Sequence, residues 1–156
     1  MLSVDFRSST GLGKKFVQAG DQQWGRKMHD DLLDAVGWAV KSGVTTKDKV
    51  AIMGGAYGGY ATLAGLTMTP DALACGVDIV APSSRCTRLK TAPAYSEAGK
   101  RQMYRRMGDP GTPEGQALWK ERSPLAYANA IKKPLLIGQA QMTHASTLPK
   151  VTRSSP

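Results

Sequence analysis

The chain contains few of the residues that define several common protein classes. It has two cysteines among 156 residues, Cys75 and Cys86, which excludes a disulfide scaffold and a zinc site built from cysteine alone. No run of eighteen apolar residues occurs, so we expect no membrane-spanning helix. The residues from Met1 to Asp5 lack the basic and apolar segments of a secretory signal. We therefore leave the compartment open, with the cytoplasm as the default expectation.

Acidic residues are also scarce, and the positive excess is concentrated in one part of the chain. Lysine and arginine number 21 against 12 acidic residues, a formal net charge of +9. The excess lies mainly in six residues of the last third: Lys100, Arg101, Arg105, Arg106, Lys132 and Lys133. Such a patch can attract nucleic acid or an acidic surface. Aromatic residues make up only 6% of the chain, too few among the bases for a stacking platform, so we expect a solvated surface and no nucleic acid.

Hydrophobic spacing predicts strands that alternate with helices. Short apolar runs predict three strands buried on both faces, over residues 50–53, 74–80 and 134–138. Helical spacing predicts helices over residues 30–41, 60–68 and 115–121. Alternation of apolar and polar residues predicts a further strand over residues 2–6, and Gly43 is placed to end the first helix in a left-handed conformation. This order is typical of an α/β fold with a parallel sheet and flanking helices.

A cluster of glycines lies between the first apolar run and the helix after it. It reads Gly54-Gly55-Ala56-Tyr57-Gly58-Gly59. G-x-S-x-G between a strand and a helix is the nucleophile elbow of α/β-hydrolases, a strained turn that crowds its neighbours. Gly54 and Gly58 occupy both glycine positions, and the backbone N–H of Tyr57 is placed to donate to an oxyanion. The central residue is Ala56, whose methyl group cannot attack a carbonyl carbon.

Other glycine loops and a metal site fit the sequence less well. A dinucleotide loop needs G-x-G-x-x-G, which the cluster lacks, although Asp78 lies about twenty positions later as such a loop requires. The run Gly11-Leu12-Gly13-Lys14-Lys15 departs from the phosphate-loop pattern and predicts a structural turn. We expect no cofactor.

His29 stands beside Asp30 and Asp31, but adjacent positions of a helix point in different directions. Because no further histidine or cysteine is spaced to complete a site, we predict helix capping and surface pairing there, and no metal. The three tryptophans, Trp24, Trp38 and Trp119, are interpreted as packing residues, and Cys75 as a small core residue.

Several segments, in order along residues 2–141, resemble one known family. They are FRSSTG at 6–11, WGRKMHDD at 24–31, AIMGG at 51–55, YGGY at 57–60, CGVD at 75–78, GDP at 108–110, RSPL at 122–125 and KPLLIG at 133–138. They are similar to the catalytic domain of the prolyl oligopeptidase family of serine peptidases, in its acylaminoacyl- and dipeptidyl-peptidase-like subgroup. The resemblance implies an α/β-hydrolase domain that cleaves peptides with a Ser-Asp-His triad.

Carried onto this sequence, the resemblance implies that Ala56 stands at the position of the serine and that Tyr57 supplies the first oxyanion donor. Gly54, Gly55, Gly58 and Gly59 would form the elbow. The family's second donor is a tyrosine hydroxyl from a segment that precedes the residues present. Its Asp follows the strand that ends at Gly138, and its His lies further on. We therefore expect a partial α/β-hydrolase fold, incomplete at both ends.

The last residues depart from the family, so we expect a catalytic-domain portion over residues 1–141 and an aberrant, disordered tail over residues 142–156. Read one base out of frame from Gln141, permitted codons spell Asn-Asp-Pro-Arg-Val and then resemble the family's own continuation. The Asp is forced, because the codon of Met142 ends in G and every codon of Thr143 begins with AC. A frameshift is our hypothesis for this tail.

Two functions remain open from the sequence. The first is a truncated serine peptidase, inactive because Ser, Asp and His are all missing from their expected places, with peptides as the substrate class by resemblance. The second is a non-catalytic α/β module that binds a complementing chain, or a second copy of itself, through open sheet edges or the basic patch.

Overall fold

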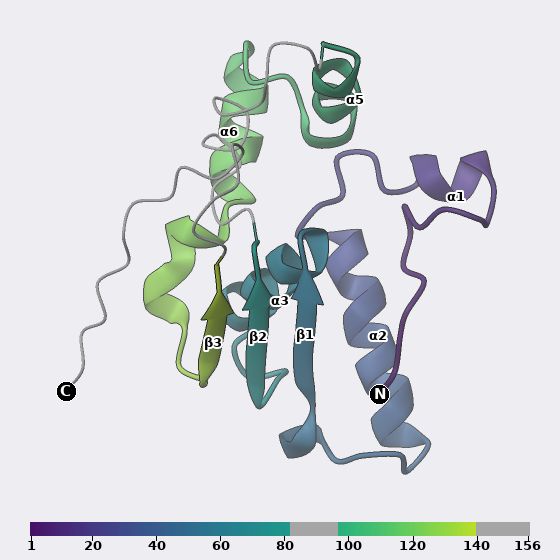
Figure 1. The fold of residues 1–156 in the computed structure, drawn as a ribbon, viewed down its shortest axis with the longest axis vertical. Helices are drawn as coiled ribbons and strands as arrows, with labels where there is room; N and C mark the ends of the chain where they lie inside the picture. The colour runs from purple at the N-terminus through teal and green to yellow at the C-terminus, as the bar shows by residue number, and fades with distance from the viewer. Residues whose placement is uncertain (82–96, 140–156) are drawn as a thin grey trace.

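The computed structural model describes residues 1–81 and 97–139 and shows helices grouped around a small sheet (Figure 1). The elements in chain order are α1 (Lys14–Gln18), α2 (Lys27–Lys41), the short 3-10 helix η1 (Lys47–Lys49), β1 (Ala51–Gly55), α3 (Tyr57–Met68), β2 (Cys75–Ile79), α5 (Glu97–Met107), α6 (Pro113–Glu121), the 3-10 helix η3 (Pro124–Ala130) and β3 (Leu135–Gly138). Among the described helices, none is long and apolar enough to cross a membrane.

The three strands form a parallel sheet in the order β1-β2-β3. Met53 is paired with Val77, and Val77 is paired with Leu136 on its other side. Helix α3 connects β1 to β2, as a parallel pair requires. The predicted α/β class, with a parallel sheet and flanking helices, is therefore confirmed.

Helix α3 is the centre of the core. Each of its residues from Gly59 to Thr67 is buried, and the helix packs against β1, β2 and η3. Small residues let it approach the sheet closely: a methyl group on Gly76 of β2 would lie 2.7 Å from Thr62 Cγ2 and 2.8 Å from Leu66 Cδ1. Figure 1 shows α3 behind the strands, with the ends of all three strands directed toward α6.

The opposite face of the sheet is open. Side chains alternate between the two faces of a strand, so Met53, Val77, Ile79 and Leu136 share the face turned away from α3. Met53 is 62% exposed, Leu136 66% and Ile79 44%. The prediction that these strands are buried on both faces is therefore wrong. In the described part of the chain, α3 packs against one face of β1 and β2, and no described helix packs against the face that carries Met53 and Leu136.

One predicted strand is absent from the described structure, and several predicted boundaries differ. Residues 2–6 do not form a strand, and they pair with none of the three strands of the described sheet. Helix α2 begins at Lys27 rather than residue 30, and its first turn buries Met28. Helix α3 begins at Tyr57 rather than residue 60. Gly43 has φ +71° just beyond α2, which confirms its predicted left-handed conformation.

The tryptophans and cysteines differ in their surroundings. Trp119 is 1% exposed, and its Nε1–H donates to the carbonyl of Gly108 at 2.9 Å. Trp38 is 57% exposed, so its predicted packing role is wrong. Cys75 is half-buried on the open face rather than in the core, and Cys86 lies outside the described residues.

Candidate functional site

A single residue, Ala56, connects β1 to α3. Its backbone has φ 50° and ψ −110°, a conformation that residues other than glycine rarely adopt. Its N–H donates to the carbonyl of Ile79 at 3.0 Å, and its carbonyl accepts the N–H of Tyr60 at 3.1 Å. The methyl group is exposed. The backbone therefore forms a sharp strand-to-helix turn that presents the side chain of residue 56 to solvent.

Two glycines of the cluster are required by close contacts. A methyl group on Gly54 would lie 2.6 Å from the Cα of Gly58, and one on Gly59 would overlap Oδ1 of Asp78. A methyl group on Gly58 would meet nothing within 4 Å. Gly58 therefore contributes the backbone that crowds Gly54, while its own side-chain position is open.

The residue after Ala56 is anchored by aromatic rings. Tyr57 begins α3, so its backbone N–H lies at the positive end of the helix dipole. Its ring centroid lies 4.5 Å from that of Trp24, in an edge-on arrangement, and 5.2 Å from that of Phe6. Trp24 also contacts Tyr60, at 4.9 Å. Edge-on and tilted pairs of this kind stabilise beyond the area they bury, so Phe6 and Trp24, from two other segments of the chain, hold Tyr57.

A buried arginine lies beneath this aromatic cluster. The carbonyl of Arg122 accepts the hydroxyl of Tyr60 at 2.8 Å, and its Nη1 donates to the carbonyl of Gly25 at 3.3 Å. Arg122 is 5% exposed, and burial lowers the pKa of its guanidinium. Its Nη2 lies 3.1 Å from the carboxylate of Glu121, outside hydrogen-bond geometry. Arg122 therefore ties the loop before α2 to the end of α6.

Two titratable residues near the elbow and α3, Asp78 and His29, are buried. Asp78 is 2% exposed beside the elbow, and burial raises the pKa of its carboxyl. His29 is 5% exposed, with Nε2 2.9 Å from the hydroxyl of Thr69, and burial lowers the pKa of its imidazole. The predicted surface role of His29 is therefore wrong. The charged residue inside an apolar strand is the sequence signal that could have singled out Asp78.

The neighbours of His29 behave differently. Asp31 pairs with Arg7 across the surface: the Nε–H and the backbone N–H of Arg7 donate to Oδ2 at 2.8 and 2.9 Å. That hydrogen bonding lowers the pKa of the Asp31 carboxyl. The surface pairing predicted for His29, Asp30 and Asp31 is confirmed at Asp31. The described residues contain no group of three His, Cys, Asp or Glu residues that could hold a metal ion.

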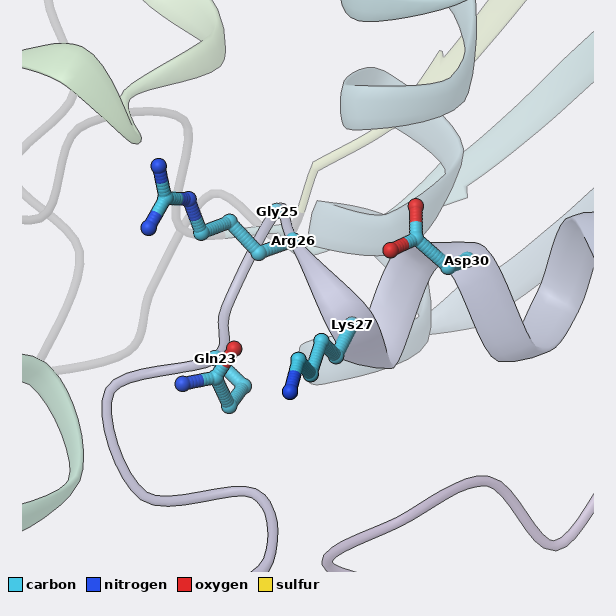
Figure 2. A pocket seen from close by; sticks show the side chains of 5 residues that line it. All are labelled: Gln23, Gly25, Arg26, Lys27 and Asp30. Carbon is cyan, nitrogen blue, oxygen red and sulfur yellow. The ribbon is translucent and has the colours of Figure 1, made fainter.

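A shallow hollow of about 550 Å³ lies at the start of α2 (Figure 2). It is lined by Gln23, Gly25, Arg26, Lys27 and Asp30. Figure 2 shows the side chains of Arg26 and Lys27 pointing in different directions rather than converging on one point. The hollow therefore lacks the convergent polar groups of a binding site.

Comparisons with known proteins agree with this geometry. The profile described as "Prolyl oligopeptidase family" matches residues 1–144. The chain belongs to the prolyl oligopeptidase family.

Among members of this family, the chain is 64% identical over 139 residues to dipeptidyl aminopeptidase BIII of Pseudoxanthomonas mexicana, covering 89% of this chain and 20% of the relative. It is 46% identical over 140 residues to dipeptidyl peptidase family member 6 of Caenorhabditis elegans, covering 89% and 19%. The chain thus spans about a fifth of the length of these relatives.

Solved structures of the family share the fold. The Pyrococcus horikoshii acylaminoacyl peptidase superimposes with a TM-score of 0.76 at 26% identity, covering 87% of this chain and 21% of that one. A Mycobacterium tuberculosis puromycin-hydrolyzing peptidase gives 0.77 at 26% identity, covering 86% and 20%. The described residues therefore form part of the α/β-hydrolase fold of prolyl oligopeptidase family peptidases.

Proposed function

We propose that this chain is a portion of a serine peptidase catalytic domain that does not hydrolyse peptides as it stands. The observation that carries the proposal is Ala56: the backbone forms a strained elbow with an exposed side chain, and that side chain is a methyl group. Acyl transfer needs an oxygen or sulfur nucleophile at this position. The names of the similar proteins support dipeptidyl or acylaminoacyl peptides as the substrate class of the complete enzyme.

The surroundings of Ala56 support the absence of catalysis. The described part of the chain contains one histidine, His29. It is hydrogen-bonded to Thr69, just beyond the C-terminus of α3. Ala56 precedes the N-terminus of the same helix, whose twelve residues span about 18 Å. A general base must reach its nucleophile within hydrogen-bond distance, so His29 cannot serve Ala56. The other histidine, His144, lies outside the described residues, and Ala56 has no proton to release.

The test is hydrolysis by the full chain and by its Ala56→Ser variant. We expect neither to release p-nitroaniline from dipeptidyl anilides or p-nitrophenol from esters above the buffer rate, because no histidine in the part of the chain that the structure describes can reach residue 56 to act as its base. Circular dichroism should show that both proteins are folded. Turnover by Ala56→Ser that a serine-directed fluorophosphonate abolishes would contradict the proposal.

The final residues form a separate part of the proposal. We propose that residues 142–156 are the product of a frameshift and lie outside the catalytic-domain portion 1–141. The family match ends at residue 144, about three residues beyond this proposed boundary. The coding DNA should show a shifted frame near codon 141 that continues into an Asp and then a His in family context. If no such frame exists, the tail is a genuine part of the protein.

A second candidate function is favoured by the open sheet face. Large exposed apolar surfaces mark interaction sites. Met53 and Leu136 lie on either side of Val77 in the register, on the same face of the sheet, and most of their surface is exposed. Under this proposal, the face binds a complementing chain or a second copy of itself. Light scattering after size exclusion should detect a complex that the double variant Met53→Ser/Leu136→Ser loses. The matched control Val44→Ser, at an exposed apolar residue outside the sheet, should retain it.

The basic patch offers little support for a nucleic-acid function. Arg105 of α5 is paired with Asp21, with Nε 3.0 Å from Oδ2. We expect no salt-dependent binding when the chain is titrated with duplex DNA at two salt concentrations. Affinity that falls steeply with salt would contradict this expectation.

A further inference from the structure

Asp78 is a buried carboxyl that the proposed chemistry leaves unexplained. It lies in β2, directly opposite Gly54 of β1 in the register, and points to the α3 side of the sheet. It is 2% exposed, and its neighbours Gly54, Gly59 and Ala81 carry little or no side chain. Burying a carboxyl is costly unless it is hydrogen-bonded. The donor that bonds to Asp78 lies in the turn after β2.

The carboxyl of Asp78 organises this turn. Its Oδ1 accepts the N–H of Ala81 at 2.9 Å, closing a loop over Ile79 and Val80. Val80 has φ +52°, a left-handed conformation that is rare for a β-branched residue. Such a conformation is strained and persists only where the surroundings determine it. The hydrogen bond from Ala81 to Asp78 is a local interaction that holds Val80 there.

The same turn holds residue 56. The carbonyl of Ile79, inside the loop closed by Asp78, accepts the N–H of Ala56 at 3.0 Å. Oδ1 of Asp78 also lies so close to Gly59 that any side chain there would overlap it. Asp78 is therefore linked to the elbow in two ways. It holds the turn whose Ile79 carbonyl accepts the N–H of Ala56, and its carboxylate lies directly against Gly59 in the first turn of α3. Thr62 adds a third link from α3 to β2, its hydroxyl 3.0 Å from the carbonyl of Gly58 and 3.4 Å from that of Val77.

We propose that Asp78 is a positioning residue for the elbow: by capping the turn after β2, it holds the carbonyl of Ile79 where it binds Ala56 N–H and so maintains the left-handed backbone of residue 56. The proposal rests on residue 56 being the nucleophile position of the family. In a chain with a serine there, the same contacts would set where the hydroxyl points.

Amide hydrogen exchange of the ¹⁵N-labelled full chain tests this coupling without any substitution. Residues that open together exchange with the same dependence on denaturant. We expect the amides of Ala56 and Ala81 to share one such opening, separate from the amides of Leu63 and Ala64 in the middle of α3. Different openings for Ala56 and Ala81 would overturn the proposal.

Substitutions then separate positioning from general stability. Asp78→Ala should speed exchange at Ala56 by about tenfold or more relative to Leu63, because the Ala81 N–H loses its acceptor. Asp78→Asn should restore the ratio to within about twofold, since an amide oxygen also accepts that bond. The control Thr67→Ala removes a buried hydroxyl that donates to Leu63 at the far end of α3, and it should leave exchange at Ala56 unchanged relative to Ala61.

An unchanged ratio of Ala56 to Leu63 exchange in Asp78→Ala would show that Asp78 serves stability alone and would overturn the proposal. If Asp78→Ala does not fold, the shared opening in the unaltered chain and the behaviour of Asp78→Asn decide the question. Hydrolysis is not part of this readout. Failure of the proposed inactivity, seen as turnover, is therefore distinguishable from failure of the positioning role, seen as uncoupled exchange.

Discussion

The backbone N–H of Ala56 donates to the carbonyl of Ile79 at 3.0 Å, so the turn that follows β1 is held by the last residue of β2. The elbow is therefore a property of two neighbouring strands rather than of the glycine cluster alone. The cluster permits the turn by leaving room for it, and β2 supplies the acceptor that selects it. This division explains why the elbow geometry is present although the side chain at its centre is inert.

The glycines at the elbow should respond to substitution in opposite directions. Gly54→Ala should destabilise the fold by about 1–3 kcal/mol, because its methyl group would overlap the backbone of Gly58. Gly58→Ala meets open space in the first turn of α3 and should stabilise it by up to about 1 kcal/mol. Urea unfolding of the two variants and the unaltered chain provides the comparison. Equal effects would contradict the steric account.

Stability should decline below neutral pH because of His29. Burial lowers the pKa of the His29 imidazole in the folded chain below the ordinary value of 6.5. As the pH falls below that value, the unfolded chain therefore binds a proton before the folded chain does. Stability should be constant above the unfolded pKa and fall as the pH drops below about 6.5, toward the folded pKa. Urea unfolding at pH 7.5 and 5.5 measures the loss. His29→Gln should reduce it.

The ion pair between Arg7 and Asp31 should make folding stability depend on pH in the acidic range. Hydrogen bonding to Arg7 lowers the folded pKa of Asp31 below 3.8, so the pair stabilises the fold above that pH. This contribution should be lost as the pH falls through the folded pKa. A double-mutant cycle with Arg7→Ala and Asp31→Asn at pH 7 and pH 2 would show it. We expect a coupling energy of up to about 1 kcal/mol at pH 7, because both side chains are partly exposed. A coupling that persists unchanged at pH 2 would refute the assignment.

The hydroxyl of Tyr60 should stabilise the packing between α3 and the end of α6. It donates to the carbonyl of Arg122 at 2.8 Å from a side chain that is 1% exposed. Tyr60→Phe leaves that buried acceptor without this donor and should cost about 1–3 kcal/mol in urea unfolding. The matched control Tyr127→Phe removes a hydroxyl from a side chain that is 40% exposed and should change little. Similar losses for both variants would count against the assigned hydrogen bond.

Local pattern was sufficient for the class of fold and for the position of the elbow. The apolar runs at 50–53, 74–80 and 134–138 each overlap a strand, and the helical spacing at 30–41, 60–68 and 115–121 overlaps α2, α3 and α6. Boundaries were less accurate, because the first turns of α2 and α3 are stabilised by tertiary contacts. Met28, for example, is buried in the first turn of α2 although the periodic pattern begins later. The strand predicted over residues 2–6 failed because a strand needs a paired neighbour as well as an alternating pattern.

The surroundings of the site depended on contacts between distant residues. Phe6, Trp24 and Tyr57 meet in one aromatic cluster although they come from three segments. His29 reads from its neighbours as a surface residue, and packing between α2 and α3 buries it. Such contacts are set by how helices pack on the sheet, which spacing within one segment does not report.

The sequence by itself determined the parallel α/β arrangement, the sharp turn between β1 and α3, and the presence at its centre of Ala56, which carries no nucleophilic atom. These follow from local rules: apolar periodicity selects strands and helices, close-packed glycines permit a sharp turn, and alanine carries no reactive atom. Tertiary structure alone decided that Asp78 caps the turn beside the elbow, that His29 is buried, and that Met53 and Leu136 are exposed on an open sheet face. Burial and long-range hydrogen bonds arise only when separate segments pack together, and the same residue type can be covered or exposed according to that packing.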